Sequence, residues 1–429
     1  MKTFIEPSRS EWAAITSRPL LDNLSLVGKV SAVLQSVREN GDQAIRQFTQ
    51  TFDGVELSEF TVSSREWTEA ENDVPETLKA AIGQAAKNIE RFHRQQVLEM
   101  QPLETQPGVQ CWRKSVGIEK VGLYIPGGSA PLFSTILMLG IPARLAGCKQ
   151  VVLCSPPDKA GKLNAAILYA AKSVGIQQVY KIGGVQAIGA MAYGTGSVPK
   201  VHKIFGPGNQ YVTCAKELVQ QTGTAIDMPA GPSEVLVLAD ESANPVFVAA
   251  DLLSQAEHGP DSQAMLITTS KDLADAVEKE VLTQLEDLPR KAIASQALRH
   301  SKLIVVKSME EAIELANIYA AEHLILSVLD PEAVAGAVIN AGSVFLGHYS
   351  PESVGDYASG TNHTLPTNGY ASAYSGVSLD SFVRKITFQK LSRQGLEGIA
   401  ETVITMAEAE GLRAHALAVS RRLENSALQ

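Results

Sequence analysis

The sequence predicts an α/β protein with two doubly wound, Rossmann-like domains on parallel sheets, plus a helical N-terminal segment and a small helical C-terminal tail. Strand-like and helix-like segments alternate from about residue 118 to about 346 in two successive βαβα arrays. Hydrophobic residues make up 45% of the chain and charged residues only 19%, as in proteins whose sheets are covered on both faces. A chain of 429 residues is too long for one core, so two or three domains are expected.

Apolar runs and helical periodicity place the elements of these arrays. In the first array they predict strands at 118–124, 150–154, 177–182 and 201–205, and helices near 132–146, 162–174, 185–193 and 209–221. In the second they predict strands at 234–239, 262–268, 302–306, 323–327 and 342–346, and helices near 245–258, 271–286, 309–320 and 331–340. Residues before about 105 are mostly helical in pattern. The helical tail after about 370 is too small for its own core and must dock on another surface.

Charge and cysteine usage exclude several classes of protein. A formal net charge of −9 and a pI near 5.5 argue against nucleic-acid or anionic-membrane partners. The charged N-terminus has no apolar core of signal-peptide length, and no window reaches transmembrane length. The four cysteines lack CxxC spacing and lie in apolar surroundings, as reduced thiols do: Cys111, Cys148, Cys154 and Cys214. We therefore expect a cytoplasmic protein.

The run 226–258 carries a candidate metal site. A strand at 234–239 leads into a helix on which Asp251, Gln255 and His258 are spaced i, i+4 and i+7, so their side chains share one face. Polar groups on an otherwise apolar helix need partners. The simpler explanation for His258 is that it bonds the last carbonyls of its own helix. The alternative is that these polar side chains bind a metal.

Glycine-rich and polar loops follow the strands of the first array. They lie at 124–128, 155–157, 183–186 and 205–209. The carboxyl ends of parallel strands meet at one sheet edge, so these loops should form a cleft. No GxGxxG dinucleotide motif is present. The turn at 205–209 leads into a helix N-terminus, which favours an anionic group, although an ordinary turn would also explain each loop.

Several long motifs together resemble the histidinol dehydrogenase family, whose members oxidise L-histidinol to L-histidine with two NAD. The motifs are the run 226–258, YIPGGSAPLFST (124–135), IFGPGN (204–209), AEHL (321–324), SPESVGDYASGTNHTLPT (350–367) and EGLRAH (410–415). The resemblance extends from roughly residue 115 to the end of the chain.

The resemblance implies specific roles for residues at the matching positions. Glu322 would activate water and His323 would handle the proton on the substrate oxygen, which suits a reaction that oxidises an alcohol and then a hydrated aldehyde. The implied NAD contacts are Tyr124, Gln186 and Asn209. The implied substrate contacts are Ser233, Gln255, His258, His323, Asp356, Glu410 and His415.

The resemblance also implies a zinc site formed by Gln255, His258, Asp356 and His415. This set has nitrogen and oxygen donors and no thiolate, unlike a structural zinc site, and it would also admit Mn or Co. It leaves coordination positions for substrate nitrogens, so we expect the metal to orient the imidazole and amine of histidinol more than to act as a Lewis acid.

The expected domain boundaries combine the element pattern with the family's fold. They are an N-terminal arm at 1–22, a discontinuous Rossmann-like domain at 23–105 and 232–370 with the metal and catalytic residues, a Rossmann-like domain at 106–231 with the NAD loops, and a helical tail at 371–429. Because Glu410 and His415 lie in the tail, we expect the tail to cross to a second subunit and complete its site in a domain-swapped homodimer. Docking on its own chain is the alternative.

Three other functions remain open at this point. A thiol-dependent aldehyde dehydrogenase would use one of the cysteines, although none has a histidine beside it in sequence. A metal-dependent hydrolase of a small amide would use the same His and Asp residues without NAD. A two-domain binding protein is the third. The remaining histidines are interpreted as surface or core residues, with His363 the least certain because it follows Asp356 closely: His93, His202, His300, His348 and His363.

Overall fold

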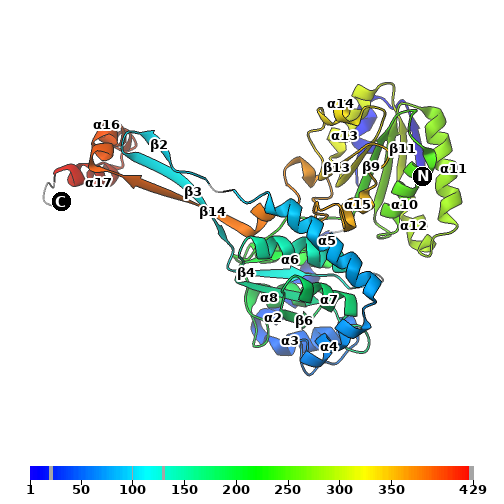
Figure 1. Cartoon of the computed structure of the whole chain (residues 1–429), viewed down its shortest axis with the longest axis horizontal. Helices are drawn as coiled ribbons and strands as arrows, with labels where there is room; N and C mark the ends of the chain where they lie inside the picture. Colours follow the sequence, from blue (N-terminus) through cyan, green and yellow to red (C-terminus); the bar gives the residue numbers. More distant parts are fainter. Residues whose placement is uncertain (19–22, 99, 128–130, 425–429) are drawn as a thin grey trace. The chain divides into compact units, whose positions relative to one another are not determined.

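The computed structural model describes residues 1–18, 23–98, 100–127 and 131–424. The chain divides into two compact units (Figure 1). The first comprises Met1–Gln96 and Ile118–Phe382, and the second Val97–Gly117 and Val383–Gln429. The first unit holds two parallel sheets, so the predicted α/β class is confirmed.

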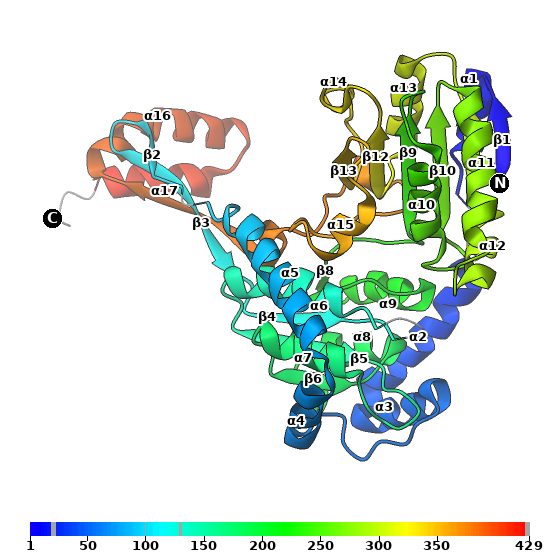
Figure 2. The ribbon, with the colours of Figure 1, turned by 45° about the vertical axis from the view of Figure 1, so that its right-hand side comes forward.

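One half of the first unit is built on a six-stranded sheet with the order β1-β11-β10-β9-β12-β13 (Figure 2). Its strands are β1 Lys2–Ile5, β9 Glu234–Ala239, β10 Gln263–Thr268, β11 Lys302–Val305, β12 His323–Ser327 and β13 Ser343–Leu346, all paired in parallel. Val235 and Val237 pack on one side with α10 Pro245–Ala256, α11 Lys271–Leu285 and α12 Lys291–Leu298. Leu236 and Leu238 pack on the other with α1 Arg9–Ile15 and α13 Met309–Tyr319. Successive side chains of a strand point to opposite faces, so both faces of this sheet are buried.

Two short helices complete this half of the first unit: α14 Pro331–Ala335 and α15 Glu352–Tyr357. α14 ends well before residue 340, where the helical pattern predicted its end. β1 was not predicted, because residues 1–22 were expected to form only an arm. Of that arm, residues 19–22 lie outside the described residues.

The second sheet of this unit has five parallel strands in the order β6-β5-β4-β7-β8. They are β4 Lys120–Tyr124, β5 Gln150–Ser155, β6 Gln178–Lys181, β7 Lys203–Phe205 and β8 Ala225–Ile226. One face packs on α4 Ser64–Asp73, α5 Glu76–Arg94, α6 Phe133–Leu145 and α7 Ala165–Ser173. The other packs on α2 Asn23–Asn40, α3 Asp42–Phe48, α8 Gly184–Tyr193 and α9 Gln210–Gln220.

The N-terminal helices join a different sheet from the one expected. Residues 23–105 were assigned to the domain of 232–370, but α2 contacts α8 and α9, α4 contacts α7, and α5 contacts α6. Leu26, Val30 and Leu34 share a core with the five-stranded sheet. The amphipathic pattern of these helices shows that each buries one face, and it carries no information about which sheet covers that face.

The second unit is an antiparallel sheet with two helices. Its strand order is β14-β3-β2, formed by β2 Leu103–Gln106, β3 Val109–Gly117 and β14 Val383–Leu391. It also contains α16 Arg393–Ala409 and α17 Arg413–Glu424, which pack on each other. The expectation of a purely helical tail at 371–429 is therefore wrong. β14 needs β3 as its partner, and β3 was predicted to belong to the domain of 106–231.

The described helices include none that is both long and apolar enough to span a membrane.

Candidate functional site

The catalytic candidates lie at the amino ends of two neighbouring strands. β9 begins at Glu234, β12 begins at His323, and Glu322 immediately precedes His323. Because a helix that follows a parallel strand runs back along the sheet, the carboxyl end of α10 returns to this same edge. Ligands of such sheets usually bind at the carboxyl ends of the strands. In this sheet, by contrast, the candidate groups lie at the amino ends of the strands.

Glu322 and His323 are both buried and both bonded to the main chain of Glu234. The Glu234 N–H donates to Glu322 Oε2 at 2.9 Å. His323 Nδ1 lies 3.2 Å from the Glu234 carbonyl oxygen. A carbonyl can only accept, so Nδ1 carries a proton, and Nε2 of the neutral imidazole is left as a proton acceptor. Among the described residues, Nε2 has no hydrogen-bond partner.

Two further carboxylates border His323. Asp356 Oδ1 lies 3.5 Å from Nε2, and Glu352 Oε2 lies 3.9 Å from Nδ1. Burial raises the pKa of Glu322 to about 8 and that of Glu352 to about 8. Burial also opposes the protonation of His323, but the surrounding carboxylates outweigh it and raise its pKa to about 10. Nε2 therefore also carries a proton at neutral pH and becomes an acceptor only once that proton is released. Three carboxyl groups thus surround His323, and a positively charged group of a ligand would find partners among them.

Three of the predicted metal ligands lie in this half of the first unit. Gln255 is buried near the end of α10, and its Nε2 has no hydrogen-bond partner in the described chain. His258 follows the helix end and interacts electrostatically with Asp356 on α15. Ser254, next to Gln255, donates to Glu352 Oε1 at 2.8 Å, which places α10 against α15. Rotating this amide by 180° would offer its oxygen in place of the unpartnered Nε2, the donor type that a metal of zinc's class accepts. Among the described residues, no three His, Cys, Asp or Glu side chains are grouped so as to hold a metal ion.

Ser233, a predicted substrate contact, is the residue before β9. Glu410 and His415 lie in the second unit. Glu410 caps the end of α16, Gly411 follows with φ +74°, and His415 is in the first turn of α17. The chain therefore bends between Glu410 and His415.

Tyr124 and Gln186, two predicted NAD contacts, lie at the carboxyl edge of the five-stranded sheet. Tyr124 ends β4, and its hydroxyl accepts from the Gly184 N–H at 3.1 Å. Gln186 is fully buried in α8, and its Oε1 has no hydrogen-bond partner among the described residues. Both therefore border one loop after β6. Of the loop after β4, residues 128–130 lie outside the described residues.

The loop at 205–209 is pressed against the end of β4. A Cβ at Gly206, where φ is +122°, would lie 2.0 Å from the Tyr124 carbonyl oxygen, so only glycine fits. The buried Lys216 donates to the Gly206 carbonyl at 2.8 Å and pairs with Asp227, which accepts from the Gly206 N–H at 2.8 Å. Asn209 caps α9 by accepting from Tyr211 and Val212 N–H groups at 3.1 Å. The ion pair and the cap hold this loop rigidly at the predicted NAD edge.

Sequence reasoning did not identify three residues at these edges. Asp53, the last residue of the π-helical turn η1 Thr49–Asp53, lies 3.4 Å from Gln186 Nε2, and burial raises its pKa to about 6. Glu352 was not singled out within its motif. His363 was grouped with the core or surface histidines but set apart because it follows Asp356 closely. Its Nδ1 bonds the Asp356 carbonyl at 3.0 Å, and its Nε2 lies 3.1 Å from Thr135 Oγ1 on α6. It thus links the site around His323 to the other half of the first unit.

Asp251, which shares the Gln255 face of α10, should make stability depend on pH. Burial raises its pKa from 3.8 to about 7, so the folded protein binds the proton more tightly than the unfolded chain does. The buried carboxylate then costs stability increasingly as pH rises from about 4 to 7. We expect Asp251→Asn to raise the melting temperature, with a gain on the order of 2–4 kcal/mol at pH 8 and a smaller gain at pH 5. Equal gains at both pH values in thermal unfolding would contradict this.

Comparison with known proteins gives one consistent result. The family model described as histidinol dehydrogenase matches residues 16–423. A histidinol dehydrogenase of Bacteroides fragilis is 61% identical over 424 residues, which is 99% of each chain. A histidinol dehydrogenase of Yersinia pestis is 53% identical and covers 97% of this chain and 94% of its own. The crystal structure of histidinol dehydrogenase from Elizabethkingia anophelis is similar with a TM-score of 0.97 and 55% identity, covering 99% of this chain and 98% of that one.

Proposed function

The chain belongs to the histidinol dehydrogenase family of NAD-dependent oxidoreductases, and from that premise we propose how its residues divide the reaction. The substrate is L-histidinol, and the product of two successive oxidations is L-histidine, with L-histidinaldehyde between them. The observation that supports this most is the buried Glu322–His323 pair, which is bonded to the Glu234 main chain and has Asp356 Oδ1 3.5 Å from His323 Nε2. A substrate with an ammonium group suits such a site.

His323 handles the proton on the substrate oxygen in both oxidations. In the neutral ring, Nε2 accepts the hydroxyl proton of the alcohol, returns it to the carbonyl oxygen as water adds to the aldehyde, and then accepts the hydroxyl proton of the hydrate in the second oxidation. The Nδ1 bond to the Glu234 carbonyl fixes the ring throughout. Glu322 activates the water that adds to the aldehyde. Burial raises the pKa of Glu322 to about 8, which makes it a stronger base than an exposed carboxylate.

A zinc ion would be held by Gln255, His258 and Asp356 together with His415. When bound, it would orient the imidazole and amine of the substrate, and Mn or Co could replace it. Ser233 and Glu410 complete the substrate contacts, with Glu410 as a partner for the ammonium group. His363 holds the Asp356 segment through its bond to the main chain.

Tyr124, Gln186 and Asn209 would hold NAD at their edge of the five-stranded sheet, and NAD would supply the hydride acceptor for each oxidation. Among the described residues Gln186 Oε1 has no hydrogen-bond partner, and the dipole at the start of α9 favours an anionic group. The link between Thr135 and His363 supports an arrangement in which this edge faces the site around His323.

The C-terminal tail completes the site of a second subunit in a homodimer. The observation that supports this is that Glu410 and His415 lie in a unit separate from Glu322 and His323. We also revise the boundary of the domain that carries the NAD loops, from 106–231 to 118–231, and we add the N-terminal helices to this domain. A cytoplasmic location stays a prediction.

The chemistry of the cysteines argues against a thiol nucleophile. Burial raises the pKa of Cys148 to about 11 and also raises those of Cys154 and Cys214, whereas a nucleophilic cysteine needs a lowered pKa. Cys111 lies in β3 of the second unit. The family assignment likewise displaces the amide hydrolase and the binding protein as explanations.

The proposed function is tested by the NADH formed per L-histidinol consumed, in protein stripped of metal and then resupplied with zinc. We expect two NADH, and only when zinc is present. One NADH would mean that oxidation stops at the aldehyde, contrary to the role given to Glu322. No NADH from folded, zinc-loaded protein would contradict the dehydrogenase assignment and favour a metal-dependent hydrolase.

A further inference from the structure

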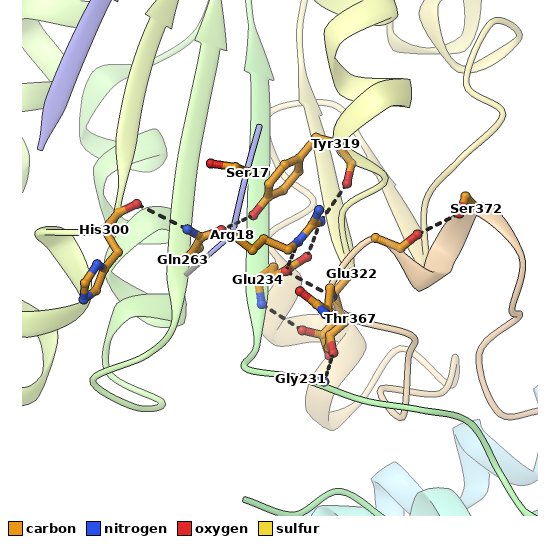
Figure 3. Close-up of polar contacts among 12 residues, drawn as sticks. Ser17, Arg18, Gly231, Glu234, Gln263, His300, Tyr319, Glu322, Thr367 and Ser372 are labelled. Atoms are coloured by element: carbon orange, nitrogen blue, oxygen red, sulfur yellow. Dashed lines mark hydrogen bonds and ion pairs between the residues drawn. The ribbon is translucent and has the colours of Figure 1, made fainter. Parts of the chain in front are cut away.

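Arg18, in the N-terminal arm, forms a buried ion pair with Glu234 (Figure 3). Its Nε and Nη2 donate to the two carboxylate oxygens at 2.5 and 2.8 Å. Nη2 also donates to the Tyr319 carbonyl at 2.7 Å, and the guanidinium lies 4.1 Å from the centre of the Tyr319 ring. The side chains of Arg18 and Glu234 are only 15% and 3% exposed. Such a two-point contact fixes both the distance and the angle between the guanidinium and the carboxylate.

The arm reaches this position along the amino ends of the strands. Lys302, the first residue of β11, donates to the carbonyl oxygens of Ile15 and Ser17. Arg18 then contacts Glu234, the first residue of β9. The segment 15–18 therefore runs along the same sheet edge that carries the catalytic pair.

Glu234 connects this clamp to the catalytic pair. Its side chain is held by Arg18 and by the Asn368 N–H at 3.1 Å. Its main chain bonds Glu322 through the N–H and His323 through the carbonyl. A shift of the Glu234 main chain would therefore move both catalytic side chains at once, since each has one hydrogen bond to it.

We propose that Arg18 is a positioning residue that sets the orientation of Glu322 and His323 through Glu234. This inference rests on the proposed function of that pair. It gives the N-terminal arm a part in the reaction beyond anchoring the chain to the sheet.

The arm also offers a matched control. Arg9 forms an equally two-pronged pair with Glu314 of α13, with both contacts at 2.5 Å. This pair is exposed, at 67% and 42%, and in the described part of the chain no hydrogen bond links Glu314 to Glu322 or His323. Arg9→Ala therefore removes an anchor of the same arm without disturbing Glu234.

The test compares Arg18→Ala and Arg9→Ala in steady-state oxidation of both L-histidinol and L-histidinaldehyde, with melting temperatures measured in parallel. For Arg18→Ala we expect kcat to fall about 10- to 100-fold for both substrates, with KM nearly unchanged, as for a misplacement of about 1 Å. Millimolar guanidinium should restore part of kcat by refilling the cavity, and sodium chloride at the same ionic strength should not. Arg9→Ala should keep the wild-type kcat.

Two further variants cover the case in which Arg18→Ala does not fold. Arg18→Lys keeps the positive charge but loses the two-point contact, so we expect an intermediate kcat. Glu234→Gln keeps both main-chain bonds but loses the ion pair, so we expect a lowered kcat that guanidinium does not restore. Wild-type kcat in either folded variant would overturn the inference.

An Arg18→Ala protein with wild-type kcat, or one that changes only KM, would overturn it as well. So would an equal loss in Arg9→Ala, because the arm would then act only as an anchor. These results differ from a failure of the proposed function, in which wild-type protein itself would not oxidise L-histidinol and this inference would fall with it.

Discussion

Glu322→Gln is expected to stop the reaction after the first oxidation, with one NADH formed per L-histidinol and L-histidinaldehyde accumulating. The amide keeps the size of the side chain, and its oxygen can still accept from the Glu234 N–H. It cannot take a proton from water, so addition of water to the aldehyde should slow by about 10²- to 10⁴-fold. The measurement is single-turnover oxidation of L-histidinaldehyde supplied directly, compared with oxidation of L-histidinol.

The control for this variant is Glu332→Gln, an exposed carboxylate on α14. It should leave the rates of both steps unchanged. If Glu322→Gln oxidises the aldehyde at the wild-type rate, another group activates the water. If it loses both steps equally, Glu322 acts on the alcohol as well, and the division of labour with His323 is wrong.

Much of the fold was predictable because buried parallel strands read as continuous apolar runs. β9 at 234–239 and β12 at 323–327 have the bounds that the sequence predicted. The second unit was not predictable in the same way. β14 is mostly exposed and pairs with β3, and neither strand shows an apolar run that would identify its partner. Pairing between segments so far apart in sequence depends on tertiary context that local patterns do not carry.

The candidate site likewise has residues that the sequence predicts and residues that it does not. Glu322 and His323 follow from their motif, but Arg18 and Glu234 do not, because an isolated charged residue looks the same in sequence whether it is buried or exposed. These two are 216 residues apart and meet only because the arm crosses the amino ends of the strands. Asp53 was missed for a similar reason, since its carboxylate is brought to Gln186 from a separate helical turn.

Mixed dimers should decide whether the C-terminal tail serves its own subunit or its partner. His323→Asn and His415→Ala should each lose most activity alone, the first through loss of the proton acceptor and the second through loss of a metal ligand. If the tail crosses, a hybrid of the two has one site with both native histidines and one with neither. Random reassociation makes half of the dimers hybrids, so about one quarter of the wild-type activity should return after the two proteins are unfolded and refolded together.

The matched control mixes His323→Asn with Gln255→Ala, both of which lie in the first unit. Every site in that hybrid lacks one native residue whether or not the tail crosses, so no activity should return. Recovery in the first mixture and none in the second would locate His415 in the partner's site. No recovery in either mixture, with hybrid dimers demonstrated by differently tagged subunits, would mean that each tail docks on its own chain, and the zinc ligands would then all come from one subunit.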